Sequence, residues 1–174
     1  MNNIKFCDEE LDIGKKAMID WNMYMREVCA NTLLNNPIII GGPNRTVEID
    51  ESLFTRRKNL GGIYRHTKEC FMFPVADRNE ATLLPIITQQ IRPDTTIISD
   101  LWRAIKIHII PGMNFVHETV NHSMNFVDPI TGANTQRIER SWKSAKERNK
   151  RHNGTHRQML DSYMCEYMWR NRIK

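Results

Sequence analysis

GGPNRTVEIDES, residues 41–52, is the stretch that decides the expected fold. Within it, TVEID alternates β-forming residues with acids, so Glu48 and Asp50 share one face of a predicted strand and the apolar residues share the other. The Gly-Gly-Pro before TVEID predicts a turn that starts this strand. A carboxylate at the end of a buried strand is costly unless it is solvated, paired or bound to a cation. Asp50 is therefore either a solvated strand-end residue or a candidate metal ligand.

Downstream of this strand, the hydrophobic periodicity predicts an antiparallel meander and then alternating helices and strands. TTIISD, at residues 95–100, has the unbroken β-branched character of a buried strand that is parallel to its neighbour, and it ends in Asp100. The remaining expected elements are a basic loop at 54–59, strands at 61–65, 70–75 and 115–120, and helices at 77–91 (where Pro85 is tolerable if it falls in the first turn), 101–110, 135–150 and 155–172.

This order of elements predicts an α/β fold, a mixed sheet of the ribonuclease H type flanked by helices. In that topology the first and fourth strands are neighbours, so Asp50 and Asp100 would meet at the centre of the sheet. Two adjacent carboxylates repel each other unless cations lie between them, and hard oxygen ligands select Mg²⁺ or Mn²⁺ over zinc. Glu139, on a helix packed against that edge, could complete the site; the alternative is a surface ion pair between Glu139 and Lys143.

Two such ions, about 3.5 to 4 Å apart, would activate water or a 3′-hydroxyl and stabilise the leaving oxygen of a phosphodiester. Lys146 lies two helical turns after Glu139 on the same helix face, where it could bind a DNA phosphate beside the metals. Trp142, between them, is expected to be a core residue rather than a platform for base stacking.

Residues 15–34 are predicted to form an amphipathic helix at the N-terminal end. Its apolar positions recur at three- to five-residue steps, and LDIG at 11–14 resembles the turn before the second helix of a helix-turn-helix. A plain packing helix is the alternative. We therefore expect residues 1–40 to be a truncated, DNA-binding helix-turn-helix remnant and residues 41–174 to be the catalytic domain. The inward row would be Met18, Trp21, Met25, Val28 and Leu33.

The composition is that of an ordinary globular protein with a basic surface. The chain has 174 residues, with 25 Lys and Arg against 20 Asp and Glu, and the excess is concentrated between Arg137 and Arg157. Such a surface attracts phosphates. The four cysteines form no C-x-x-C pair, which argues against a zinc knuckle or a redox dithiol. No charged leader or apolar run of about 18 residues is present, so we expect neither secretion nor a membrane partner.

Five segments together resemble the Merlin-type DDE transposases, relatives of a bacterial insertion-sequence family. The resemblance covers residues 11–174, and the segments occur in the same order: GGPNRTVEIDES, CFMFPVADRNEATLLPII, IRPDTTIISDLWRA, TVNHSMNFVDPITGANTQRIERSWKSAK and LDSYMCEYMWR. It implies a ribonuclease H-like catalytic domain that performs cut-and-paste DNA transposition with two Mg²⁺ or Mn²⁺ ions. It also implies that the partners are transposon ends and target DNA, and that the active form is a homo-oligomer.

The resemblance assigns Asp50, Asp100 and Glu139 as the catalytic acids and metal ligands, and Lys146 as the basic residue that follows them. Asn121 and His122, in TVNHS, correspond to family positions near the active edge, with a structural turn as the alternative. Further candidate DNA-binding residues are Lys143, Arg140, Arg148, Arg56 and Arg57. The chain is shorter than the family pattern between Lys58 and Gly61, which predicts a weakened central hairpin.

Other functions remain open from the sequence. The main alternative is a catalytically decayed or host-recruited DNA-binding protein derived from such a transposase. A metal-dependent nuclease or junction resolvase of the same fold, and a protein-binding scaffold with solvated acids, are further alternatives. DNA as substrate predicts a nuclear location in a eukaryotic source, and otherwise the cytoplasm or nucleoid.

Overall fold

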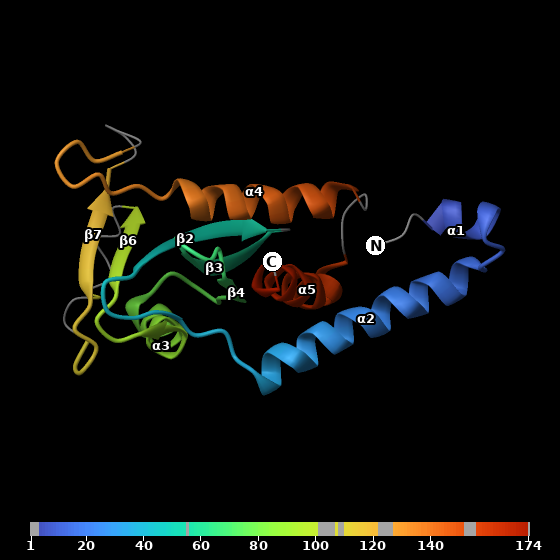
Figure 1. The fold of residues 1–174 in the computed structure, drawn as a ribbon, viewed down its shortest axis with the longest axis horizontal. Coiled ribbons are helices and arrows are strands. Elements are labelled where there is room, and N and C mark those ends of the chain that lie inside the picture. Colours follow the sequence, from blue (N-terminus) through green and yellow to red (C-terminus); the bar gives the residue numbers. More distant parts are fainter. Residues whose placement is uncertain are drawn as a thin grey trace.

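A five-stranded mixed sheet forms the centre of the protein, with strand order β4-β3-β2-β6-β7 (Figure 1). The computed structural model describes residues 4–54, 56–100, 107, 110–121, 127–151 and 156–173. The strands of this sheet are β2 (Thr46–Phe54), β3 (Arg57–Tyr64), β4 (Cys70–Pro74), β6 (Thr96–Asp100) and β7 (Val116–Val120). A second, two-stranded parallel sheet consists of β1 (Ile40–Gly41) and β5 (Ile91–Arg92).

The pairing confirms that the first and fourth predicted strands are neighbours. β2 pairs with β6 in parallel, in a register that places Ile49 beside Ser99. β7 is parallel to β6 on the other side, with Asp100 beside Val120. β2, β3 and β4 form the expected antiparallel meander. The α/β fold, a mixed sheet flanked by helices, is therefore as the sequence predicted.

The predicted basic loop at 54–59 is wrong, because most of it is strand. β2 continues to Phe54 and β3 begins at Arg57, and the two strands pair without a break from Val47 and Tyr64 to the hairpin end. The short segment between Lys58 and Gly61 does not interrupt the pairing of this hairpin, and its expected weakening effect on stability stays a prediction. These residues have cross-strand partners on β2, so they lengthen the ladder instead of interrupting it.

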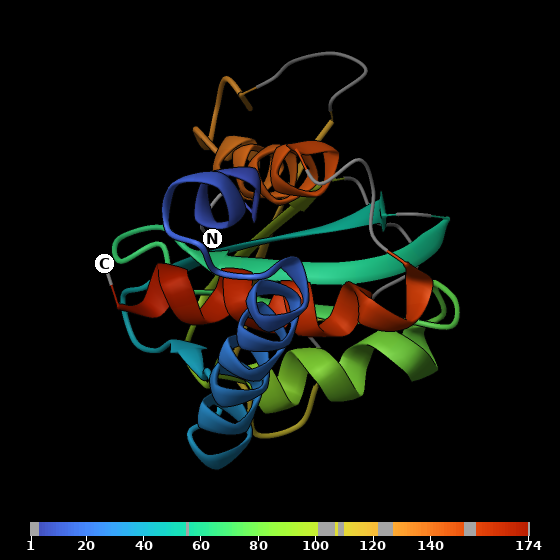
Figure 2. The ribbon, with the colours of Figure 1, turned by 90° about the vertical axis from the view of Figure 1, so that its right-hand side faces the viewer.

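Helices cover both faces of the sheet (Figures 1 and 2). α4 (Gln136–Arg151) lies on the opposite face from α3 (Glu80–Gln90). α5 (Leu160–Arg172), preceded by the 3₁₀ turn η2 (Arg157–Met159), packs against β4. The condition set for Pro85 is not met, because α3 begins at Glu80 and Pro85 lies inside the helix, beyond its first turn. The helix expected at 101–110 lies outside the described residues, apart from the buried Ile107 and the partly buried Ile110.

One apolar core holds the sheet and these helices together. It includes the predicted inner row of α4, Ile138, Trp142 and Ala145, and so confirms Trp142 as a core residue. Burying large apolar side chains stabilises by roughly 1.5–3 kcal/mol each. The largest buried members contributed by the sheet and by α3 are Ile49, Leu60, Phe71, Met72, Leu83, Ile87 and Ile97.

Two helices precede the sheet, α1 (Ile4–Glu10) and α2 (Lys15–Asn35). The predicted inward row of α2 is largely wrong, because Trp21, Met25 and Val28 are exposed. Met18 is buried as predicted, and α2 also buries Arg26 and Cys29; it packs against α5, where the Arg26 guanidinium stacks on the Tyr163 ring. Burial on α2 therefore follows contact with α5 and not the apolar spacing of the helix.

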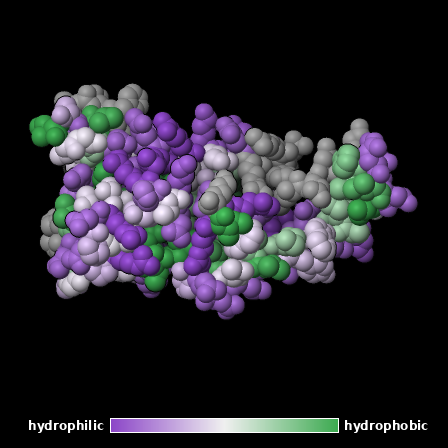
Figure 3. Space-filling view, in the orientation of Figure 1, coloured by the Kyte–Doolittle hydropathy of each residue, from purple (hydrophilic) through white to green (hydrophobic). Residues whose placement is uncertain are grey.

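Apolar side chains also gather where α1 lies (Figure 3). There Phe6, Leu11 and Ile13 are exposed. The division of the chain at residue 40 remains a prediction. No helix in the described part of the chain is long and apolar enough to span a membrane.

Candidate active site

Two of the three predicted catalytic acids line one cavity between β2 and α4. Asp50 comes from the central strand and Glu139 from the first turn of α4, and the cavity has a volume of about 380 Å³. The full lining is Asp50, Ser52, Glu139, Trp142, Lys143, Lys146, Glu147 and Lys150. Acids and lysines therefore share this cavity, an arrangement that suits a cation and a phosphate held side by side.

Asp100, the remaining predicted acid, is the exposed last residue of β6. β6 is the parallel neighbour of β2, and the register that pairs Ile49 with Ser99 brings Asp50 and Asp100 to the same level. Residues at the same level of paired strands project to the same face of the sheet. The sheet thus places both aspartates on the face covered by α4.

The donor types fit Mg²⁺ or Mn²⁺, because all three predicted ligands are carboxylates. Among the described residues, no three His, Cys, Asp or Glu side chains lie close enough together to hold a metal ion. The fold gathers the acids into one region, and their use as metal ligands stays a prediction.

Lys146 occupies the position predicted for a phosphate-binding residue. Its Nζ donates a hydrogen bond to the Ser52 Oγ at 2.6 Å, across the cavity that Asp50 and Glu139 line. Glu139 is held in turn by Thr135, whose Oγ1 donates to the Glu139 Oε1 at 2.9 Å. These contacts limit the movement of both side chains relative to β2 and to the start of α4.

Glu48, which the sequence analysis did not assign to the site, joins β2 directly to α4. Its side chain is fully buried, and its Oε2 accepts hydrogen bonds from the backbone N–H groups of Arg137 and Ile138 at 2.8 and 3.1 Å. Its Oε1 accepts from the Arg65 Nε at 2.6 Å. A carboxylate at a helix N-terminus satisfies free backbone donors and complements the helix dipole. Glu48 therefore fixes the turn that carries Glu139 relative to the strand that carries Asp50.

Gly61 lets α4 approach the sheet closely at the same place. It lies opposite Asp50 in the β2–β3 ladder, and a Cβ at this position would stand 2.6 Å from the Cζ2 of Trp142. The Trp142 ring is buried against this backbone, and within the described structure its Nε1 has no hydrogen-bond partner. A Gly pair inside a strand is a sequence signal of such close approach.

Glu51 is a buried acid beside Asp50, on the opposite face of β2. Burial raises the pKa of Glu51 to about 7; the Arg78 guanidinium opposes this rise and the Asp50 charge adds to it. Arg78 forms an ion pair with the Glu51 Oε2, although no described residue donates a hydrogen bond to either carboxylate oxygen. The ion pair with Arg78 therefore offsets only part of the cost of burying the Glu51 charge.

The predicted DNA-binding residues whose side chains the structure describes come from two flanks of α4 and from the β2–β3 hairpin. Lys143 and Lys146 line the cavity of the acids, whereas Arg140 lies on the other flank of α4. Arg56 is exposed at the end of the β2–β3 hairpin, and the Arg57 Nη1 pairs with the Asp161 Oδ1 at 2.9 Å. Arg148 belongs to α4, but its side chain is outside the described part. Their contact with DNA stays a prediction.

Asn121 follows β7 directly, one residue after Val120, which is paired with Asp100. It therefore lies at the strand edge where the acids are, as the resemblance implies. His122 is outside the described residues. The roles of both stay open.

The fold of this chain is shared by a solved structure. The catalytic core domain of BIV integrase superposes with a TM-score of 0.50 and 12% sequence identity, covering 68% of this chain and 80% of that one. This likeness shows the fold, which is ribonuclease H-like.

Sequence relatives then give the family. A transposase-like protein of Haemophilus influenzae, itself uncharacterized, is 30% identical over 104 residues, which is 59% of this chain and 81% of that protein. The model of the ISXO2-like transposase domain matches residues 41–171. This chain belongs to the ISXO2-like transposase domain family.

Proposed function

We propose that this chain is a Merlin-type DDE transposase domain, which cleaves DNA and joins the ends to a target in cut-and-paste transposition. The observation that carries the proposal is the cavity between β2 and α4, where Asp50 and Glu139 stand beside Lys143 and Lys146. Membership of the ISXO2-like transposase domain family supports it.

Asp50, Asp100 and Glu139 would hold two Mg²⁺ or Mn²⁺ ions. Such ions supply a nucleophile at neutral pH and stabilise the leaving oxygen of a phosphodiester. Hydrolysis and strand transfer differ only in whether water or a 3′-hydroxyl attacks. The same acids therefore serve both steps.

Other side chains of this protein would bind the DNA phosphates and orient the catalytic acids. Lys146, fixed by Ser52, binds a phosphate next to the scissile one, and Lys143 adds a second positive charge on the same flank. Glu48 holds the first turn of α4 against β2, so that Glu139 faces Asp50 across the cavity. The transposon ends and the target DNA are the partners, and a homo-oligomer is the working form. The cell nucleus is the site of action if the source is eukaryotic, and otherwise the cytoplasm or nucleoid.

Incubation of the purified protein with element-end DNA and Mn²⁺ tests the proposal. We expect nicking and joining by the parent protein and by Glu27→Gln, a control on the exposed face of α2. We expect neither step from Asp50→Asn, Asp100→Asn or Glu139→Gln. Equal activity in all variants would place the chemistry elsewhere.

Binding without cleavage would favour the alternative, a decayed or host-recruited DNA-binding protein. The test is decisive only if the aspartate variants are folded. Their circular dichroism spectra and unfolding midpoints should therefore be compared with those of the parent.

A further inference from the structure

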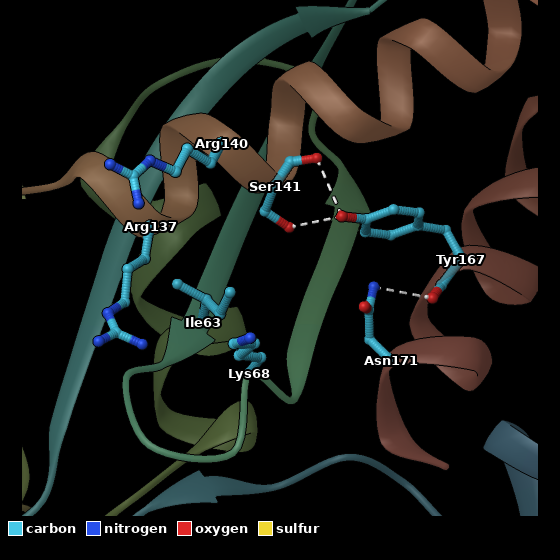
Figure 4. A pocket seen from close by; sticks show the side chains of 7 residues that line it. All are labelled: Ile63, Lys68, Arg137, Arg140, Ser141, Tyr167 and Asn171. Carbon is cyan, nitrogen blue, oxygen red and sulfur yellow. Dashed lines mark hydrogen bonds between the residues drawn. The ribbon is translucent and has the colours of Figure 1, made fainter. Parts of the chain in front are cut away.

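A second cavity, of about 550 Å³, lies between α4 and α5, over the end of β3. Figure 4 shows Arg137 and Arg140 on one side of it, Tyr167 and Asn171 on the other, and Lys68 below. Ser141 and Ile63 complete the lining. The cavity thus takes residues from two helices, a strand and the β3–β4 turn.

The charge of this cavity is entirely positive. Three of its seven lining residues are cationic and none is acidic. Within the described part of the chain, the Lys68 ammonium and the Arg140 guanidinium have no hydrogen bond or ion pair. Like charges held around one hollow repel each other, and a bound anion relieves that repulsion.

The polar walls of the cavity are held in place by hydrogen bonds. The Ser141 Oγ and the Tyr167 OH lie 3.1 Å apart, and the Tyr167 OH donates to the Ser141 carbonyl oxygen at the same distance (Figure 4). The Arg137 Nη1 donates to the Arg65 carbonyl oxygen at 2.6 Å, which fixes that guanidinium. The backbone N–H of Lys68 closes its turn on the Tyr64 carbonyl oxygen at 3.0 Å.

This cavity and the candidate active site lie on different flanks of α4. Residues three and four apart share a helix face, so Glu139, Lys143 and Lys146 form one row. Arg137, Arg140 and Ser141 form another row, turned toward α5. The buried residues Ile138, Trp142 and Ala145 lie between the two rows and hold α4 on the sheet.

We propose that the cavity between α4 and α5 binds a backbone phosphate of a DNA segment other than the one at the acids. Arg137 and Arg140 offer planar donors for phosphate oxygens, and Lys68 adds a charge from the opposite side. The proposal rests on the proposed function only for DNA as the polyanion. α4 then lies between two DNA segments, one on each flank.

The experiment compares DNA binding by the parent, by Lys68→Ala/Arg140→Ala, and by a charge-matched control pair, Lys16→Ala/Arg92→Ala, which lines neither cavity. Fluorescence anisotropy with a labelled duplex is measured over a salt series without metal, so cleavage does not interfere. We expect the Lys68/Arg140 pair to weaken binding roughly tenfold more than the control. We also expect the slope of log K against log salt to fall by about 1 for each phosphate that the variant no longer binds.

Equal losses in the two pairs would overturn the proposal, because they would reflect net charge alone. A free phosphate compound is the other source of the same chemistry, and thermal unfolding with pyrophosphate tests it. If pyrophosphate raises the melting temperature of the parent but not of the Lys68/Arg140 pair, while both bind DNA equally, the DNA proposal is wrong.

Cleavage by the parent protein is scored separately with Mn²⁺ and element-end DNA. If the parent cleaves DNA and the Lys68→Ala/Arg140→Ala variant binds DNA as tightly as the parent, only the proposal of a second site is refuted. If the Lys68→Ala/Arg140→Ala variant selectively loses DNA binding but the parent does not cleave DNA, the proposed function is refuted and the second site is supported.

Discussion

Replacing Glu48 removes the hydrogen bonds that join the strand carrying Asp50 to the helix carrying Glu139. The Glu48 carboxylate is fully buried and accepts three hydrogen bonds, one from Arg65 and two from the first turn of α4. Glu48→Ala leaves two backbone N–H groups without their acceptor, and each such group costs about 1–3 kcal/mol. It also leaves the Arg65 charge unpaired, which typically costs about 3–5 kcal/mol when the pair is fully buried.

These free-energy costs are not additive. The Arg65 side chain is 29% exposed, so water compensates part of the cost of losing its ion pair. We therefore expect Glu48→Ala to lower the free energy of unfolding by about 3–4 kcal/mol. Glu48→Gln keeps one oxygen for the helix N–H groups but loses the ion pair, and we expect about half that cost.

Urea unfolding followed by circular dichroism measures both variants, with Glu27→Ala on the exposed face of α2 as the control. A surface substitution of this kind changes stability by about 0.5 kcal/mol or less. A Glu48→Ala value within that range would refute the role assigned to the buried carboxylate. A double-mutant cycle with Arg65→Ala then isolates the pair, and we expect a coupling of about 1–3 kcal/mol.

Three further predictions follow from buried contacts and shifted pKa values. Gly61→Ala places a Cβ against Trp142 and should destabilise by about 1–3 kcal/mol, whereas Gly14→Ala, with no atom within 4 Å of the new Cβ, should be nearly neutral in the same urea assay. Because burial raises the pKa of Glu51 to about 7, the native state holds this proton more tightly than the unfolded state. The free energy of unfolding should therefore fall as the pH rises from 4.5 to 7, by about 1–2 kcal/mol after solvent screening. Glu51→Gln should flatten that slope in metal-free thermal melts, and an unchanged slope would assign it to other groups. Burial raises the pKa of Cys70 to about 12, so iodoacetamide should label this thiol only after unfolding, as mass spectrometry can show; rapid labelling of the native protein would contradict its burial.

Local sequence was sufficient for elements whose burial follows their own periodicity. The alternation in TVEID predicted β2, and TTIISD predicted a buried parallel strand beside it. The inner row of α4 was predicted for the same reason, since one side of that helix faces the sheet along most of its length. The order of strands then followed from the topology those elements imply, and with it the approach of Asp50 and Asp100.

Local sequence was insufficient where a partner distant in the chain decides burial. α2 has apolar residues on two stripes, and only the stripe that contacts α5 is buried, so Trp21 is exposed and Arg26 is not. The hairpin between β2 and β3 extends into charged residues because cross-strand hydrogen bonds outweigh their weak strand preference.

The sequence by itself determined the order of the strands and helices, the acids within β2 and at the end of β6, and the basic character of α4. Hydrophobic periodicity and the placement of charges encode these features locally. Only the tertiary structure decided that Glu48 fixes the start of α4, that Gly61 admits Trp142, and that the basic residues of α4 face two separate cavities. The physical reason is that each depends on which side of a helix meets which strand, and packing between segments far apart in the chain sets that orientation.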